Sequence, residues 1–360
     1  AINIGGVTIH RAFKAPIKPL IEKPEKLAKT LLKADVLICD EISMCRVDLF
    51  DFMIYQVMHA NMYRRKEKRP DIQIIVIGDF FQLPPVITPK DRDVLVSKYH
   101  NLGKGFAFES QYWKYCGFLN VVLKQLMRQS DKEFITELNK MRYGDKSSIH
   151  YFNTAHNKEY DESAITIVGT NNKAETINDS KLAELPGQSQ IFEAEIDGEV
   201  KESDKAVPEI LELKVGARVI MAVNDTDDRY KNGSFGYIRR MTKGKLFVEI
   251  DNLNGTVCVE KYTWNILGYD LKNGKVEQTV LGTYKQFPLK LGYAITIHKS
   301  QGQTYDKANI EPKCWDCGQL YVALSRCKTI DKLHLMSYIL DNALVTSQEV
   351  KDFYSKIETK

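Results

Sequence analysis

Polar side chains follow two apolar segments of this chain. Asp40 and Glu41 come directly after the run Val36–Cys39, and Gln82 lies shortly beyond a second run, Ile72–Ile77. A predicted helix joins the two runs, so we expect parallel strands whose carboxyl ends share one edge of a sheet. Ligands of such sheets bind at that edge. The sequence therefore predicts that Asp40, Glu41 and Gln82 lie near one another in a ligand site.

Nucleotide hydrolysis is the reaction that these residue types favour. An aspartate at a strand end can hold Mg²⁺ through its water shell, and an adjacent glutamate can orient and deprotonate a water. A glutamine on the neighbouring strand end can contact the terminal phosphate. We expect Asp40 at the metal, Glu41 as general base and Gln82 as phosphate sensor. The alternative for the acidic pair is structural, because short motifs of this kind also arise by chance.

A helical pattern follows the first predicted strand. Val47, Phe50, Ile54 and Val57 recur at intervals of three or four residues, which predicts a helix with one face against the sheet. The basic run Arg64–Arg69 comes next, and a solvated loop is expected there because charge runs usually face water. A local track for nucleic acid is the alternative.

The composition is that of a globular protein with two or three domains. The chain has 360 residues, of which 43% are hydrophobic and 27% charged, and its net charge of +4 is too small to identify a nucleic-acid partner. Seven cysteines and no apolar leader argue against an exported disulfide scaffold, and Cys314 and Cys317 form a lone pair that predicts no metal site. We expect no membrane span and a cytoplasmic location, or a nuclear or mitochondrial one in a eukaryote.

An arginine separates the next two predicted elements. Leu119–Leu123 predicts a third strand, and Ser130 with Glu133 forms a capping-box pattern at the start of a helix that Gly144 would end. Arg128 lies between the strand and the helix, where a side chain can bind an anion. An ordinary surface arginine is the alternative.

A second set of strands and helices predicts another parallel sheet. Ala164–Val168 is expected to be a buried strand, followed by a helix over about Lys173–Leu185. Leu291–Ile297 is expected to be a buried strand that leads into the polar run His298–Gly302. Gln319–Arg326 is expected to be helical.

The segment between these elements has a β pattern. Three Asn-Gly pairs separate short apolar runs between about 210 and 290, which predicts hairpins in a small barrel-like insertion. Residues 187–208 are polar and irregular, so a connector is expected there.

Five blocks, in the order in which they occur, resemble the motifs of superfamily-1 DNA helicases, in the version of the Pif branch that is related to RecD. The blocks span nearly the whole chain, so chance agreement is improbable although each is weak alone. They are Asp40-Glu41-Ile42-Ser43-Met44, Gly78-Asp79-Phe80-Phe81-Gln82-Leu83-Pro84-Pro85, Leu126-Met127-Arg128-Gln129, Ala294-Ile295-Thr296-Ile297-His298-Lys299-Ser300-Gln301-Gly302 and Tyr321-Val322-Ala323-Leu324-Ser325-Arg326.

The resemblance implies an α/β fold with two RecA-like parallel-sheet lobes, ATP between them and single-stranded DNA across their top. It implies a first lobe at residues 1–118, a second lobe at 119–209 and 289–360, and an SH3-like β subdomain inserted at 210–288. It also implies movement from 5′ to 3′ along one strand toward a duplex junction, by a chain expected to be monomeric. These expectations rest on analogy with the family.

The resemblance also assigns roles to residues. At the nucleotide it places Asp40 on Mg²⁺, Glu41 as base and Gln82 at the γ-phosphate, with Arg128, Gln301, Gly302 and Arg326 reaching ATP from the second lobe. Arginines supplied across a cleft stabilise the transition-state charge only when the lobes close. On DNA it places Thr8, His10, Thr296, His298 and Lys299. Phe81 is a weaker DNA candidate, for which burial is an equally good explanation.

One motif of the family is missing from these residues. No G-x-x-x-x-G-K-[ST] sequence, whose amides and lysine hold the phosphates of ATP, occurs in the chain. In the family this loop lies shortly before the segment that matches Gly5–His10. We therefore expect an N-terminally truncated helicase with impaired ATP binding and hydrolysis. The alternative is a non-enzymatic relic or scaffold that binds single-stranded DNA, although a scaffold has no need of Glu41, Arg128 and Arg326.

Overall fold

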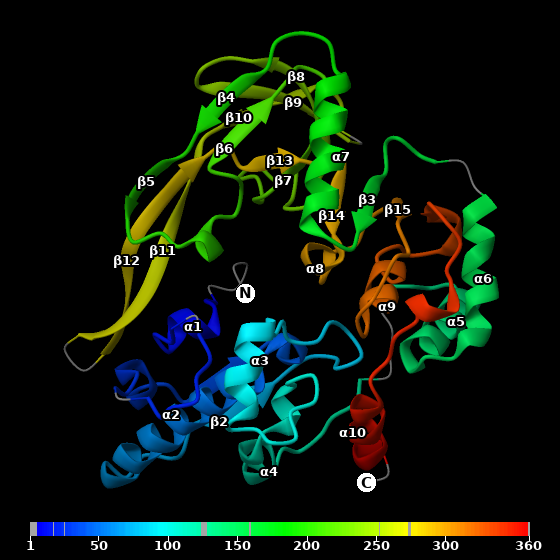
Figure 1. Cartoon of the computed structure of the whole chain (residues 1–360). Helices are drawn as coiled ribbons and strands as arrows, with labels where there is room; N and C mark the ends of the chain where they lie inside the picture. The colour runs from blue at the N-terminus through cyan, green and yellow to red at the C-terminus, as the bar shows by residue number, and fades with distance from the viewer. Residues whose placement is uncertain are drawn as a thin grey trace.

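The computed structural model describes residues 6–16, 18–24, 26–123, 128–157, 160–251, 253–272 and 275–358. Two α/β lobes are present, and a β-rich part, here called the β region, lies above the first lobe and beside the second (Figure 1). None of the helices in these ranges has the length and apolar content that crossing a bilayer would require.

The first lobe contains the predicted pair of parallel strands. Val36 of β1 pairs with Gln73 of β2, and Cys39 pairs with Val76, so both polar clusters follow the same sheet edge as expected. The helix α2 connects the strands and buries Phe50, Met53, Ile54 and Val57. The elements of this lobe are α1 (Ile9–Ala12), η2 (Lys29–Leu32), β1 (Val36–Cys39), η3 (Ile42–Met44), α2 (Val47–Lys66), β2 (Gln73–Val76), α3 (Pro89–Val96), η4 (Ala107–Glu109) and α4 (Gln111–Cys116).

The basic run Arg64–Arg69 is only in part the solvated loop that was predicted, because it begins within α2 and is exposed from Arg65 to Lys68. Arg64 lies in the last turn of α2 and is only 1% exposed. Its guanidinium donates to the carbonyl oxygens of Leu32 (3.1 Å) and Pro70 (2.9 Å) and to the carboxylate of Asp35 (2.8 Å). The prediction failed at Arg64 because an arginine can be buried when each of its three nitrogens has an acceptor.

The second lobe is built on the parallel strand order β14-β3-β15-β16. All four residues of β3 are buried, as the sequence predicted. The elements of this lobe are α5 (Lys132–Tyr143), η5 (Lys146–Ser148), α6 (Ile149–Asn153), η6 (Thr154–Asn157), β3 (Ile165–Val168), α7 (Asn171–Glu184), β14 (Ala294–Thr296), α8 (Ile297–Ser300), β15 (Ala308–Ile310), α9 (Gln319–Leu324), η8 (Ile330–Lys332), β16 (Leu333–Leu335), η9 (Asp341–Ala343) and α10 (Gln348–Glu358).

Two local predictions in this part of the chain were wrong. Leu119–Leu123 forms no strand, and Leu119 and Leu123 are 92% and 88% exposed. The cap of α5 is Asp131 rather than Ser130, because its carboxylate accepts from the backbone N–H groups at the helix start. The end of α5 at Gly144, with φ of +78°, is confirmed. Leu126 and Met127 of the third motif lie outside the described residues.

The β region extends over residues 190–291 and is larger than the predicted insertion. Residues 187–208 are not an irregular connector, because β4 and β5 lie there and pair with later strands. At the other end β13 pairs with β7. The pair Asn273-Gly274 lies outside the described residues. The elements are β4 (Gln190–Glu193), β5 (Glu195–Gly198), η7 (Glu202–Asp204), β6 (Ile210–Leu213), β7 (Arg218–Met221), β8 (Phe235–Met241), β9 (Lys245–Ile250), β10 (Thr256–Glu260), β11 (Tyr262–Lys272), β12 (Lys275–Gln286) and β13 (Leu289–Leu291).

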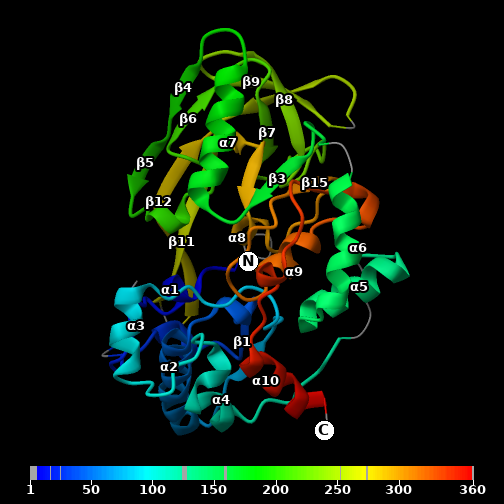
Figure 2. The same cartoon turned by 45° about the vertical axis from the view of Figure 1, so that its right-hand side comes forward.

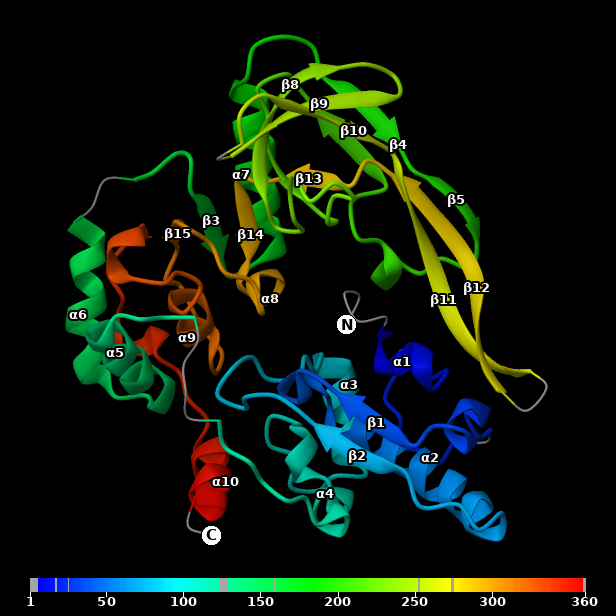
Figure 3. The same ribbon diagram turned by 180° about the vertical axis from the view of Figure 1, so that it is seen from behind.

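Two segments cross between the parts of the molecule. The long hairpin of β11 and β12 runs from the β region down to η2 and α1 of the first lobe (Figure 3). Arg11 of α1 also forms an ion pair with Asp204 of η7. At the other end of the chain, Val350 and Tyr354 of α10 are buried with the core of the first lobe, although sequence position assigned α10 to the second (Figure 2). The division of the chain into domains stays a prediction.

The buried arginine gives a first prediction. Arg64→Gln is expected to lower the free energy of unfolding by about 2–3 kcal/mol, because buried acceptors lose a charged donor. The neighbouring Arg65→Gln is the control, because Arg65 pairs with Asp71 at the exposed surface. This change should lower the free energy of unfolding by no more than about 1 kcal/mol. Urea unfolding measures both variants. Equal losses would contradict the role of Arg64.

Candidate nucleotide and DNA sites

The general-base candidate Glu41 has an unusual backbone. Its φ of +52° and ψ of +46° place it in the left-handed region, which costs a residue with a side chain about 1–2 kcal/mol. The Glu41 N–H donates to Oδ1 of Asp40 at 2.9 Å, and the next N–H, that of Ile42, donates to the carbonyl of Ile77 at 2.9 Å. These bonds hold the turn that follows β1 and direct the Glu41 side chain toward the second lobe.

Glu41 meets the fourth motif of the sequence across the two lobes. The amide Nε2 of Gln301 donates to Glu41 Oε2 at 2.9 Å. Gly302 follows with φ of +74°, and a Cβ at this position would lie 3.9 Å from Glu41 Oε1. Gln301 Oε1 is buried and accepts no hydrogen bond from the described residues. The Gln301 side chain thus links the carboxylate of Glu41 to the second lobe, and its buried Oε1 is an acceptor without a partner among the described residues.

Arg326 is buried close to this pair. It is 2% exposed and donates to the carbonyls of Val322 (2.7 Å), Ser300 (3.1 Å) and Gln303 (3.0 Å). Burial and the positive charge of Arg128 lower the pKa of the Arg326 guanidinium to about 10, against the opposing effect of Glu41. Two guanidinium groups near one carboxylate leave a positive potential, which suits phosphate.

Arg128 itself is half-buried at the same place. Its Nη1 lies 3.5 Å from the Ser325 carbonyl, and the neighbouring Gln129 donates to that carbonyl at 3.1 Å and to the carbonyl of Cys327 at 3.3 Å. The structure thus brings Glu41, Gln301 and Arg326 together with Arg128, as the sequence predicted for residues of one site.

Gln82 lies on a loop that enters the second lobe. The next residue, Leu83, is fully buried in the core of that lobe. Gly318, at the start of α9, packs against the loop so closely that a Cβ would lie 2.3 Å from the Gln82 carbonyl oxygen and 2.5 Å from that of Phe81. Gln82 is therefore positioned by both lobes.

The base of this loop is held by a charge pair that the sequence did not indicate. Arg142 of α5 donates twice to the carboxylate of Asp79, at 2.9 and 3.2 Å, and Tyr354 of α10 donates to Asp79 at 3.3 Å. Burial lowers the pKa of Arg142, but the bonds to Asp79 outweigh it and the net pKa is raised. The guanidinium also lies 4.5 Å from the centroid of the Phe81 ring.

Phe81 is a packing residue in this conformation. Its ring is 4% exposed and stacks on Tyr354 with centroids 4.8 Å apart. A ring covered in this way has no face left for a nucleobase, so its assignment as a DNA contact is corrected in favour of burial.

The other DNA candidates lie at two helix starts that both face the β region (Figure 3). Thr8 caps α1, where it accepts from the Arg11 N–H, and Thr296 caps α8 in the same way through the Lys299 N–H. Thr296 is 4% exposed, whereas Thr8 and Lys299 are exposed. Burial lowers the pKa of both His10 and His298, so the neutral imidazole is favoured near neutral pH. Their DNA contacts stay predictions.

Asp40 is the residue that fits a magnesium ion. The described residues contain no group of three or more His, Cys, Asp or Glu side chains that could hold a metal. Mg²⁺ keeps several waters and needs only one or two carboxylates besides the phosphates, and Asp40 is exposed beside Glu41. Cys314 and Cys317 are buried free thiols, and burial raises the pKa of Cys314 to about 12.

Asp79, Arg142 and Gly318 were missed by sequence reasoning. Asp79 lies inside a motif, but its partner is distant in the sequence, and nothing local marks Arg142 as buried. Gly318 was readable only as a possible helix boundary. Their roles depend on contacts between the lobes.

Comparison with known proteins identifies the family. A family model described as PIF1-like helicase matches residues 1–150. The ATP-dependent DNA helicase Pif1 of Campylobacter jejuni is 31% identical over 401 aligned residues, which cover 99% of this chain and 86% of that protein. The chain belongs to the Pif1-like helicase family. A vertebrate relative, PIF1 of Danio rerio, is also 31% identical, but this chain covers only 56% of that protein.

Solved structures of Pif1 helicases share the fold. Bacteroides sp Pif1 in complex with ADP-AlF4 has a TM-score of 0.84 at 33% identity, over 100% of this chain and 85% of that one. Bacteroides Pif1 bound to ssDNA has a TM-score of 0.69 at the same identity and coverage. The α/β fold with RecA-like lobes is thereby confirmed. Unliganded Pif1 from Bacteroides sp has a TM-score of 0.83, so this chain is arranged more like the structures without DNA than like the one bound to ssDNA.

Gly318→Ala is expected to disturb the contact between α9 and the Gln82 loop. Gly117→Ala is a matched control, because Gly117 also has a positive φ (+56°) but a Cβ added there would meet none of the described atoms within 4 Å. The control should lower the free energy of unfolding by about 1 kcal/mol, because only its own backbone conformation is strained. Gly318→Ala should lower it by at least about 2 kcal/mol, because the neighbouring backbone must also move. Urea unfolding measures the difference. Equal costs would show that the loop and α9 are not tightly packed.

Proposed function

We propose that the chain is the motor core of an ATP-dependent DNA helicase that moves from 5′ to 3′ on single-stranded DNA. The observation that carries the proposal is the Gln301–Glu41 hydrogen bond, which joins the general-base candidate of one lobe to the other lobe beside Arg326. The relatives support it, because they are named ATP-dependent DNA helicases and their solved structures include complexes with ADP-AlF4 and with ssDNA.

The first lobe supplies acid–base chemistry in the proposed reaction. Glu41 accepts the proton of the attacking water, and Gln301 of the second lobe holds the Glu41 carboxylate through its Nε2–H group. Asp40 would hold Mg²⁺, which neutralises the charge on the phosphates when it is bound. Gln82 contacts the terminal phosphate from the loop that both lobes hold.

The second lobe supplies positive charge. Arg326 and Arg128 lie where charge develops on the phosphoryl oxygens, and a guanidinium there lowers the barrier only while the lobes are closed. Four of the five N–H groups of Arg326 donate to Val322, Ser300, Gln303 and Ser325, so one Nη2–H group is left for a phosphate oxygen. Because these charges are supplied across the cleft, hydrolysis is coupled to closure of the lobes.

The proposed DNA strand runs below the β region. Thr8 and His10 contact it from the first lobe, and Thr296, His298 and Lys299 contact it from the second. Contacts from both lobes to one strand let the opening and closing of the lobes become steps along DNA. Duplex junctions ahead of the strand are the proposed substrate, and a monomer is the proposed working form.

ATP binding is proposed to be weak in residues 1–360 taken alone. No G-x-x-x-x-G-K-[ST] sequence occurs among them, so the amide cradle for the phosphates is not supplied by these residues. A scaffold that only binds single-stranded DNA is the second candidate. It is less well supported, because it gives no reason for the strained Glu41 or for the bond that Glu41 receives from Gln301.

The enzyme proposal is tested with a fusion that carries the phosphate-binding segment of a Pif1 relative ahead of Ala1. The fusion is expected to hydrolyse ATP with stimulation by single-stranded DNA, and residues 1–360 alone to hydrolyse it slowly. Glu41→Gln in the fusion should reduce kcat by about 10²- to 10⁴-fold, because the general base is lost. Steady-state phosphate release measures all three proteins.

Glu67→Gln, an exposed acid after α2, is the control and should leave kcat unchanged. Affinity for single-stranded DNA should be the same in both variants. An inactive fusion that still binds single-stranded DNA would favour the scaffold.

A further inference from the structure

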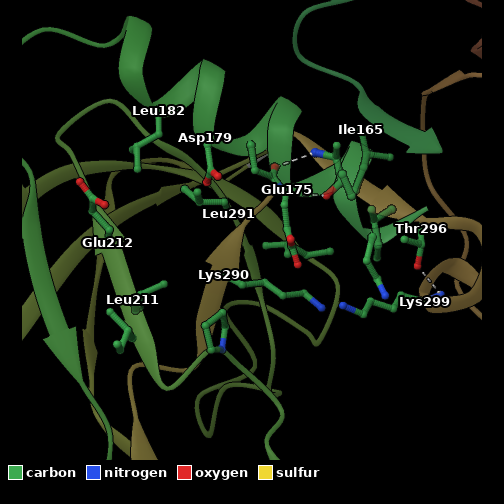
Figure 4. A pocket seen from close by; sticks show the side chains of 18 residues that line it. Ile165, Glu175, Asp179, Leu182, Leu211, Glu212, Lys290, Leu291, Thr296 and Lys299 are labelled. Carbon is green, nitrogen blue, oxygen red and sulfur yellow. Dashed lines mark hydrogen bonds between the residues drawn. The ribbon is translucent and has the colours of Figure 1, made fainter. Parts of the chain in front are cut away.

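A pocket of about 350 Å³ lies at the junction of the second lobe and the β region (Figure 4). Its lining includes α7, the strands β6, β13 and β14, and the start of α8. This volume is within the range of pockets that take small ligands. Leu182, Leu211 and Leu291 contribute an apolar wall.

Two lysines converge in this pocket. Lys290 and Lys299 extend from different elements, and their ammonium groups point toward one another (Figure 4). Burial lowers the pKa of Lys290, and the charge of Lys299 lowers it further, with no carboxylate opposing the shift. Within the described part of the chain, neither lysine forms an ion pair. Two cations that face each other raise the local positive potential, which favours binding of an anion between them.

The acidic residues of the pocket do not provide that balance. Glu175 and Asp179 of α7 and Glu212 of β6 also line it, but all three are exposed. None of them contributes to the pKa of Lys290. The lysine end is therefore suited to a phosphate group, and the apolar wall is suited to the sugar or base attached to it.

We propose that Lys290 and Lys299 bind one phosphate of the DNA strand, with the adjoining nucleoside against the apolar wall. The proposal rests on the proposed function and adds Lys290 to the DNA contacts. DNA is favoured over a free nucleotide because Thr296 and Lys299, which line the pocket, belong to the segment assigned to DNA contact above. A DNA strand that contacts Thr296 and Lys299 would therefore already lie at the pocket.

The test compares Lys290→Gln with wild type in binding fluorescent oligothymidine over a range of salt concentrations. Loss of one phosphate contact should weaken binding about 3- to 10-fold near 100 mM salt and reduce the slope of log K against log salt by about 0.7. Lys290→Arg keeps the charge and should retain most of the affinity. Lys243→Gln, an exposed lysine between β8 and β9, is the control and should change neither quantity.

A second measurement uses the wild-type chain and does not depend on the folding of a variant. An anion beside Lys290 raises its lowered pKa, so DNA binding should take up protons at alkaline pH. Calorimetry of oligothymidine binding in buffers of different ionisation enthalpy, between pH 8 and 10.5, detects this uptake. No proton uptake, or an unchanged salt slope in Lys290→Gln, would overturn the proposal.

Small phosphates distinguish the source of the ligand. Inorganic phosphate or thymidine monophosphate is added to the complex of the chain with fluorescent oligothymidine, and displacement of the oligothymidine is measured. Competition that Lys290→Gln abolishes supports a phosphate site on the DNA path. Binding of thymidine monophosphate without any competition would assign the pocket to a free nucleotide and overturn the DNA proposal. A chain that binds no single-stranded DNA would instead refute the proposed function.

Discussion

The ion pair between Arg142 and Asp79 is the contact on which the rest of the structure depends. It joins an element of the second lobe to the loop of the first, with Tyr354 of the last helix as a third member. Each charged side chain is about one-fifth exposed (19% and 20%), so desolvation is costly for either charge alone. The two parallel hydrogen bonds offset that cost, and the aromatic ring of Phe81 covers the guanidinium.

Several features of the proposed motor depend on this ion pair between the lobes. The loop that starts at Asp79 places Gln82 against Gly318, and the same closeness of the lobes lets Gln301 reach Glu41. The short helix α8 connects the two proposed sites, because Lys299 lines the pocket and Gln301, two residues later, donates to Glu41. In the proposed mechanism, a rearrangement at the DNA strand would therefore have a short path to the general-base candidate.

The sequence predicted the local parts of this arrangement better than the contacts between them. The strand ends before Asp40 and before the loop that carries Gln82 were readable because apolar runs and polar ends are local patterns, and the motif order indicated the lobes. The buried Arg64 shows the limit, because its acceptors at Leu32 and Asp35 are distant in the sequence. The failed strand at Leu119–Leu123 shows it too, because an apolar run forms a strand only where a partner strand is available, and both leucines are exposed. The same reason hid Lys290, whose importance lies in its approach to Lys299 rather than in its neighbours in the sequence.

A double-mutant cycle on Asp79 and Arg142 tests the central claim most directly. The free energy of unfolding is measured by urea for Asp79→Asn, Arg142→Met and the double variant. The account predicts a coupling of at least about 1.5 kcal/mol, because either single change leaves a partly buried partner without its counter-charge. The pair Lys104–Asp316 also joins the lobes but is more exposed (44% and 32%), so its coupling should be no more than about 0.5 kcal/mol in the same cycle. Equal coupling for the two pairs would contradict the account.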